Sequence, residues 1–319
     1  MKRRRGLMLL LCVLLAALAV FFGIRAVRKS ARGARRADVQ TVLTTVTGEN
    51  LSRISYIYDK NEITLLYDGG RWTYAGDPDM PLNPDIPNRM YEIVTKLASV
   101  RTVARYTDKA DYGINSASIR VTAEGKNGAS YGFAIGSYVG FSEGCYIMMN
   151  GNENLYFVPG ALGGAFSYHG ADLVELPPIP KIGRVDYLCV ERPGERFEVL
   201  LDAATGDWYS PANGERVALN AINTRATVGL LSRLEWLRCV DYSVPEAKMA
   251  QYGLDRPTVI TAGYVGADHA LHRFALCVGA AEGSSYYARL PSSQAVLLLQ
   301  GELVAPLLNA GLDKLRANP

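Results

Sequence analysis

The side chains best suited to metal binding or nucleophilic chemistry are few and scattered in this sequence. Of its three histidines, His269 and His272 lie close together. Residues three apart on a strand point to opposite faces, however, and a zinc site needs three or four ligands. Cys12 falls in an apolar N-terminal run, and the other cysteines lack the spacing of a metal site or redox motif: Cys145, Cys189, Cys239 and Cys277. We expect no metal site, and a disulfide among these distant cysteines stays open.

No pattern of residues specifies a reaction. The sequence contains neither a Gly-x-Ser-x-Gly nucleophile elbow nor a glycine-rich phosphate loop ending in Lys-Ser or Lys-Thr. Its 31 acidic residues would allow a catalytic carboxylate pair, because such pairs converge from distant positions, but the sequence singles out none. We therefore expect a protein that is not an enzyme, with no catalytic residues and no cofactor.

The formal net charge of +3 hides an uneven distribution. Ten of the 34 lysines and arginines lie in residues 2–36, which contain no acid, so the rest of the chain has 24 bases against 31 acids. A nucleic-acid-binding surface requires clustered lysines and arginines. The acidic body therefore argues against a nucleic-acid partner.

The basic N-terminus, residues 1–5, precedes an uncharged run from Gly6 to Ile24. A helix of that length is roughly 28 Å long, close to the thickness of a hydrocarbon core. Because the apolar run continues past the cleavage-like Ala17-Leu18-Ala19, we predict an uncleaved, single-pass signal anchor at residues 6–24. Residues 25–50 would form a tether. Both flanks of the span are basic, so the charge rule is nearly balanced, and we expect the N-terminus inside and the body outside the cell.

Aromatic and glycine residues recur at matching places in the two halves of the remaining chain. Tyr112-Gly113 and Tyr252-Gly253 each close a short helical pattern and precede a run of strands. A Gly-x-Trp strand precedes each pair and an Ile/Val-Gly strand follows it. The landmarks are Trp72, Tyr112, Gly113 and Gly136 in the first half and Trp208, Tyr252, Gly253, Pro257 and Gly279 in the second. All recur except Pro257, which occurs only in the second half. Their common order favours an internal duplication.

The duplication predicts repeat unit 1 at residues 51–175, a proline-rich linker at 176–181 and repeat unit 2 at 182–319. Short turn signals join successive strand patterns, which favours antiparallel pairing. Apolar residues also recur every three or four positions over residues 86–100 and 220–237, as in amphipathic helices. We therefore predict an α+β fold in which two homologous units, each a mostly antiparallel sheet with one main helix, follow the transmembrane helix.

We interpret these landmarks as structural. Gly113 and Gly253 permit the positive φ at which helices often end, and Pro257 keeps the residue before it extended. Trp72 and Trp208 are expected in the core beneath the helices, with ligand stacking as the alternative.

This combination of features resembles the DUF4340 family of bacterial membrane-anchored proteins. The basic start and the single span are shared, and the residues that carry the resemblance are Gly70, Trp72, Tyr112, Gly113, Ile114, Ile135 and Gly136, then Gly206, Trp208, Tyr252, Gly253, Leu254, Asp255, Pro257, Val278 and Gly279. The first unit lacks a proline after its Tyr-Gly-Ile-Asn. The resemblance implies no catalytic residues, and it implies an accessory role beside ABC-type export systems related to gliding-motility transporters.

We therefore expect a non-enzymatic, membrane-anchored protein that lies outside the cytoplasm and binds a partner, such as a subunit of an ABC-type export system. The alternative is a receptor that binds a saccharide or a peptide between the two repeat units. An unrecognised hydrolase is the third hypothesis.

Overall fold

The computed structural model describes residues 41–140, 143–160, 162–212 and 214–316. The predicted basic N-terminus, the signal anchor at Gly6–Ile24 and the tether as far as residue 40 lie outside the described residues. In the described part of the chain, no helix is both long and apolar enough to cross a membrane. Backbone contacts divide the chain into two compact units, Met1–Glu62 with Arg89–Ser167 and Ile63–Asn88 with Tyr168–Pro319.

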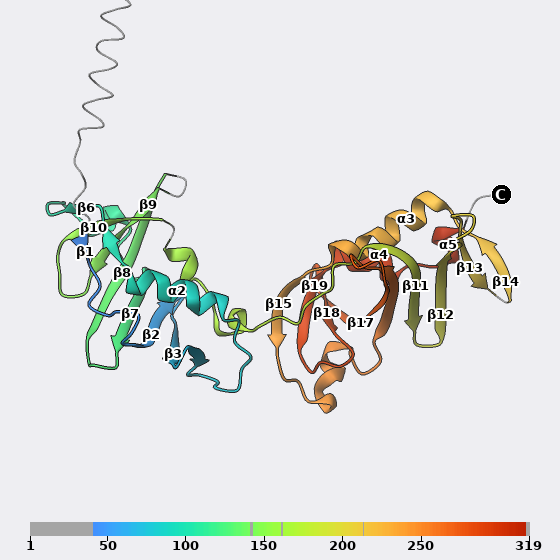
Figure 1. Ribbon diagram of the computed structural model, residues 1–319, viewed down its shortest axis with the longest axis horizontal. Coiled ribbons are helices and arrows are strands. Elements are labelled where there is room, and N and C mark those ends of the chain that lie inside the picture. The colour runs from blue at the N-terminus through green and yellow to red at the C-terminus, as the bar shows by residue number, and fades with distance from the viewer. Residues whose placement is uncertain (1–40, 141–142, 161, 213, 317–319) are drawn as a thin grey trace, which may run out of the picture. The chain divides into compact units, whose positions relative to one another are not determined.

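The first large sheet has the strand order β4-β3-β2-β7-β8-β9-β10-β6 (Figure 1). Antiparallel ladders join β2 to β7, β7 to β8, β8 to β9 and β9 to β10, as expected of strands connected by short turns. The strands are β2 (Leu51–Tyr58), β3 (Asn61–Asp68), β4 (Arg71–Tyr74), β6 (Arg101–Val103), β7 (Ile119–Gly125), β8 (Ser130–Val139), β9 (Gly144–Met149) and β10 (Leu155–Pro159).

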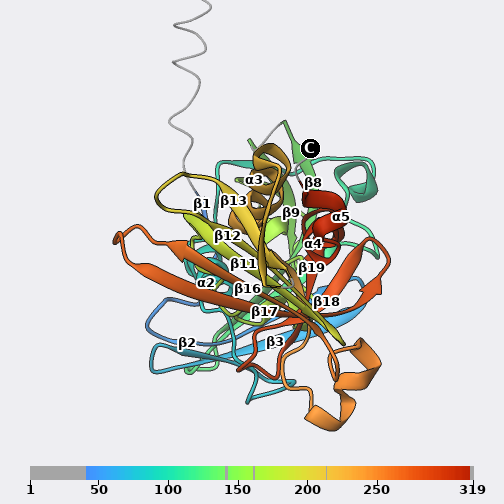
Figure 2. The same ribbon diagram turned by 90° about the vertical axis from the view of Figure 1, so that its right-hand side faces the viewer.

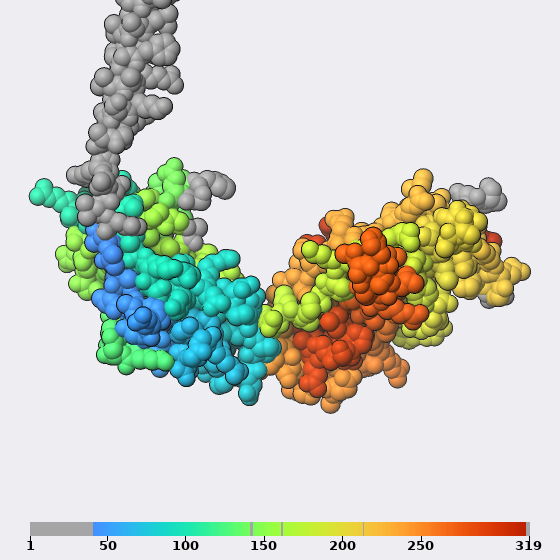
Figure 3. Space-filling model, in the orientation of Figure 1, coloured from blue at the N-terminus to red at the C-terminus, as the bar shows by residue number. Residues whose placement is uncertain are grey.

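A separate two-stranded ladder fastens the start of the described chain. β1 (Thr41–Val42) pairs antiparallel with β5 (Ala98–Ser99). In the space-filling view, the first described residues, in blue, lie beside cyan residues of this region (Figure 3). The last part of the predicted tether is therefore hydrogen-bonded to the folded body.

Helix α2 (Asp85–Thr95) packs on the first sheet through residues four apart, as the apolar pattern predicts. Met90 and Val94 are fully buried, and the Tyr131 hydroxyl of β8 donates a hydrogen bond to the Val94 carbonyl. The helix ends before the predicted residue 100, because the chain turns into β5 and β6. There the Val100 amide donates to the carbonyl of Phe157 at 3.0 Å.

The second large sheet has the order β14-β13-β12-β11-β16-β17-β18-β19-β15, and its described ladders are antiparallel. The prediction of an α+β protein with mostly antiparallel sheets is thus confirmed. The strands are β11 (Arg184–Arg192), β12 (Glu195–Leu201), β13 (Trp208–Ala212), β14 (Glu215–Ala218), β15 (Trp236–Asp241), β16 (Thr258–Val265), β17 (Leu271–Glu282), β18 (Ser285–Arg289) and β19 (Val296–Gln300).

Helices cover one face of the second sheet and a shorter segment covers the other. Figure 2 shows α3 (Ala221–Gly229), α4 (Gly301–Leu308) and α5 (Leu312–Leu315) on one side and the orange segment near residue 250 on the opposite side. Two separate apolar clusters correspond to these two faces, the larger one including residues of all three helices. The sheet is therefore covered along one face by the helices and buried at part of the other face.

The predicted helix over residues 220–237 is wrong in length and in its buried face. The α-helix stops at Gly229, a 3-10 turn spans Leu230–Arg233, and Trp236 already belongs to β15. Ile222 is 79% exposed, whereas Thr224 and Val228 are buried. The apolar spacing is that of a helix, but the last residues of the pattern belong to β15, which pairs with β19 at the edge of the sheet.

The two tryptophan landmarks lie under the start of α2 and α3, with different hydrogen bonding. The Trp72 indole N–H donates to Asn88 Oδ1, sixteen residues later, at 2.9 Å. The residue sixteen positions after Trp208 is Thr224. Among the described residues, both the Trp208 indole nitrogen and the Thr224 hydroxyl are buried without a hydrogen-bond partner. A threonine side chain is shorter than that of asparagine, and its hydroxyl makes no bond to the indole.

We predict that Thr224→Asn restores this hydrogen bond and stabilises the protein. A buried hydrogen bond that satisfies two unpaired groups contributes on the order of 1 kcal/mol. Denaturant unfolding of Thr224→Asn measures it, with Thr227→Asn on the same helix as the matched control. A Thr224→Asn variant no more stable than the parent would show that the two positions are not equivalent to Trp72 and Asn88.

A second prediction concerns alkaline pH. Burial raises the pKa of Tyr131 to about 12, whereas an exposed tyrosine has a pKa of about 10. As pH rises from about 10 to about 12, the unfolded chain loses this proton while the folded chain retains it, so stability is lost on that rise. Tyr131→Phe should lower the slope of unfolding free energy against pH in this range. Tyr106→Phe, a half-buried tyrosine, is the control, and equal slopes in both variants would contradict the prediction.

Candidate functional site

The first Tyr-Gly landmark ends a short helix and turns the chain into the sheet. The 3-10 helix η1 (Lys109–Tyr112) begins where the Asp108 carboxylate accepts the Ala110 amide at 2.9 Å. Gly113 follows with φ of 76°, a left-handed conformation that favours glycine, and its amide donates to the Ala110 carbonyl at 2.9 Å. We call residues 109–114 the first joint.

The second landmark has the same local geometry. The 3-10 helix η5 (Glu246–Tyr252) ends at Gly253, whose φ is 66°. The Gly253 amide donates to the Ala250 carbonyl, and the Leu254 amide donates to the Met249 carbonyl, both at 3.0 Å. Pro257 lies immediately before β16. We call residues 246–254 the second joint.

In each joint, the backbone carbonyl of the tyrosine packs against a glycine of a strand. A β-carbon on Gly136 would overlap the Tyr112 carbonyl oxygen and lie 2.9 Å from Ile114 Cδ1. A β-carbon on Gly279 would likewise overlap the Tyr252 carbonyl oxygen and lie 2.9 Å from Leu254 Cγ. The structure therefore brings Tyr112, Gly113 and Gly136 together, and separately Tyr252, Gly253 and Gly279. The two tryptophan landmarks lie elsewhere, under the helices.

The tyrosine rings of both joints make the same kind of aromatic contact. Tyr112 packs edge-on against Tyr146 of β9, with ring centroids 4.8 Å apart, and Tyr252 packs edge-on against Tyr287 of β18 at 4.9 Å. Such pairs contribute about 0.5–1.5 kcal/mol beyond the area that they bury. The arrangement holds the joint against the sheet.

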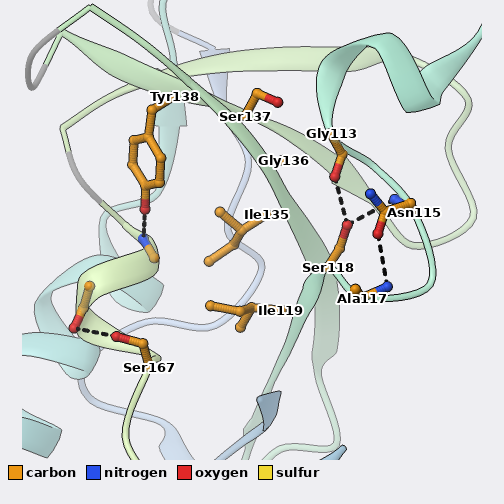
Figure 4. Close-up of a pocket in the computed structure, with 12 residues that line it drawn as sticks. Gly113, Asn115, Ala117, Ser118, Ile119, Ile135, Gly136, Ser137, Tyr138 and Ser167 are labelled. Atoms are coloured by element: carbon orange, nitrogen blue, oxygen red, sulfur yellow. Dashed lines mark hydrogen bonds between the residues drawn. The ribbon is translucent and has the colours of Figure 1, made fainter. Parts of the chain in front are cut away.

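A hollow of about 550 Å³ lies beside the first joint (Figure 4). Its lining consists of backbone, hydroxyl and amide groups with two isoleucines: Gly113, Asn115, Ala117, Ser118, Ile119, Ile135, Gly136, Ser137, Tyr138, Gly163, Gly164 and Ser167. None of these side chains carries a formal charge at neutral pH. The hollow is therefore chemically neutral.

Hydrogen bonds hold the two walls of this hollow. The Ser118 hydroxyl donates to the Gly113 carbonyl and accepts the Asn115 amide, both at 2.9 Å. On the other wall, the Tyr138 hydroxyl accepts the Gly163 amide (Figure 4). Burial raises the pKa of Tyr138 above its ordinary value. Its hydroxyl, protonated at neutral pH as in any tyrosine, can also donate a hydrogen bond. This lining can bind a neutral polar group such as a sugar hydroxyl or a peptide amide.

The histidines and cysteines form no metal centre in the described residues, where no cluster of three or more suitable ligands occurs. The His272 ring nitrogen lies 2.9 Å from the Asp268 carboxylate, and this hydrogen bond lowers the pKa of Asp268. Burial raises the pKa of four buried, free thiols, which makes them poor nucleophiles: Cys145, Cys189, Cys239 and Cys277. The open question of a disulfide among them is thus answered for this structure.

Sequence reasoning did not single out Asn115, Ser118 or Tyr138. A register irregularity in the β8–β9 ladder, between Ile135 and Tyr138, separates Tyr138 from the regular alternation of its strand. The only sequence signal was the polar Ser137-Tyr138 pair directly after Gly136, and such a pair is common in turns.

These features define a class of antiparallel α+β protein in which a tyrosine-glycine joint closes on a strand glycine. Residues 72–257, more than half of the chain, match the model of a domain of unknown function, DUF4340. The chain therefore belongs to the DUF4340 family, and the resemblance carried by the landmarks is confirmed. The match begins at Trp72 and ends at Pro257. No curated protein and no solved structure matches the chain.

We predict that Gly136→Ala and Gly279→Ala each destabilise the protein by about 1–3 kcal/mol or more, because the added methyl group overlaps a backbone carbonyl. Gly164→Ala and Gly229→Ala are the matched controls, since a β-carbon at either position meets no atom within 4 Å. Thermal or denaturant unfolding measures the difference. The close contact would be disproved by landmark variants as stable as these controls.

Proposed function

We propose that this protein is a non-enzymatic binding component of the cell envelope, anchored by residues 6–24 with its body outside the cytoplasm. The observation that carries this proposal is the uncharged run Gly6–Ile24 behind a basic N-terminus, followed by a largely acidic body. Membership of a family whose members are expected beside ABC-type export systems favours a subunit of such a system as the partner.

The β1–β5 ladder supports a short connection between this anchor and the body. Thr41 pairs with Ser99, so only residues 25–40 would link the span to the first sheet. A chain of that length extends to at most about 55 Å. The anchored protein would therefore work close to the membrane surface, within reach of a membrane-embedded partner.

We further propose that the body is an internal duplication, with repeat units at residues 51–175 and 182–319 joined by a linker at 176–181. Strands β4-β3-β2-β7-β8-β9-β10-β6 follow the same order as β13-β12-β11-β16-β17-β18-β19-β15. The equal spacing of Trp72 to Asn88 and of Trp208 to Thr224, and the repeated contact between joint and strand glycine, also support it.

Three experiments test the anchored, partner-binding role. A reporter fused after Pro319 should be active outside the cytoplasm, and deletion of residues 6–24 should release the protein from membranes. A reporter active only in the cytoplasm would contradict the proposed topology, in which the body lies outside the cytoplasm. Co-purification from membranes should bring down transporter subunits, and their absence from the purified complex would count against the export partner.

The neutral hollow favours a second candidate, a receptor for a saccharide or a peptide. Its hydroxyl and amide lining, with Ile119 and Ile135 among the lining side chains, suits a ligand that has both polar groups and an apolar face. The sequence-based hypothesis placed such a ligand between the repeat units, whereas this hollow lies beside the first joint.

A further inference from the structure

A groove of about 430 Å³ lies beside the first joint and shares Asn115 with the neutral hollow. Ala134 lines the groove and its neighbour Ile135 lines the hollow, and successive strand residues point to opposite faces. The groove is lined by Lys109, Ile114, Asn115, Ser116, Arg120, Ala134, Met148, Met149, Asn150, Gly151 and Asn152. Two of these side chains are cationic, and none is acidic.

The same face of the second sheet is packed with apolar side chains. Met249, Leu254 and Cys277 are buried there in a small cluster, against which Val259 packs. The two sheets can be compared residue by residue, because Gly136 in the first sheet and Gly279 in the second contact the carbonyl of the tyrosine in their joint. These two glycines are therefore equivalent positions. Counted from these glycines, Ala134 occupies the place of Cys277.

The two cations of the groove stand where the second sheet has apolar residues. Arg120 pairs with Ala134 across the β7–β8 ladder, as Val259 pairs with Cys277 across the β16–β17 ladder. Lys109 precedes Tyr112 by three residues, as Met249 precedes Tyr252. Three apolar side chains thus correspond to a lysine, an arginine and a smaller alanine. The exchange leaves open a space that is filled under the second joint.

The charge on the two faces is balanced differently. Under the second joint, Arg289 lies 3.3 Å from the Glu246 carboxylate. Neither Lys109 nor Arg120 forms an ion pair with any described residue, and the Arg120 guanidinium only reaches the backbone carbonyls of Ser116 and Asn115, at 3.5 Å. A cation without a fixed counter-charge can attract an anion, and a guanidinium can bind a carboxylate or a phosphate through two parallel hydrogen bonds.

We propose that this groove of the first sheet binds a small organic anion. Arg120 and Lys109 hold its carboxylate or phosphate group, and its apolar part lies on Ile114, Ala134 and Met148. The proposal concerns the first sheet alone, and it does not depend on a ligand in the neutral hollow.

The test uses the full chain, purified in detergent and labelled with ¹³C at the methionine methyl groups. Citrate and inorganic phosphate are titrated separately at low ionic strength, and glycerol serves as the neutral control. The Met148 and Met149 methyl signals should shift saturably with citrate, with phosphate or with both, which identifies the preferred anion. The Met249 signal should not shift, because its site is filled.

Variants separate the site from non-specific charge effects. Arg120→Gln or Lys109→Gln should weaken binding about tenfold, the equivalent of one charge-assisted hydrogen bond. Lys248→Gln, which removes a cation from the second joint, should leave it unchanged. Lys109→Met combined with Arg120→Val introduces the residues of the second sheet, so this variant should fold stably and lose binding.

Three results would overturn the proposal. The Met148 and Met149 signals could fail to respond to either anion, Lys248→Gln could weaken binding as much as Arg120→Gln, or the combined Lys109→Met and Arg120→Val variant could fold and still bind.

Discussion

In both sheets, the structure depends on one contact, in which the backbone carbonyl of the joint tyrosine packs against a strand glycine. A β-carbon on Gly136 would overlap the Tyr112 carbonyl oxygen, and a β-carbon on Gly279 would overlap the Tyr252 carbonyl oxygen. Glycine at both positions allows the close approach. The close approach fixes the height of each joint above its sheet. It thereby sets the edge-on contacts of Tyr112 with Tyr146 and the burial of Leu254.

The sequence was informative about elements and less so about what they contact. Tyr-Gly and Ile/Val-Gly stood out as separate landmarks, because short helix ends and strand glycines have local signatures. Their contact with each other was not predicted, since it depends on ladder register between segments far apart in the chain. Apolar spacing found α2 and α3, but placed their ends too late. Ala98–Ser99 pairs with β1 in the separate two-stranded ladder, and Trp236–Asp241 forms the edge strand of the second large sheet.

The two joints have the same local geometry, but the residues around them differ in size and polarity. Under the second joint, Met249 and Cys277 belong to a second, smaller apolar cluster, so the sheet is buried on both faces at this place. Around the first joint the same positions are polar or small, and a neutral hollow and a cationic groove lie beside it. The space beside the second joint is therefore filled, whereas two cavities stay open beside the first. Sequence reasoning missed this difference because it looked for what the halves share.

Native-state hydrogen exchange of the second joint tests the central contact most directly. If the joint is an integral part of the sheet, the amides of Gly253 and Leu254 should open with the same free energy and denaturant dependence as the amides of β17. This common opening is the expected result. Joint amides that exchange through an independent opening of low free energy, while β17 stays protected, would contradict it.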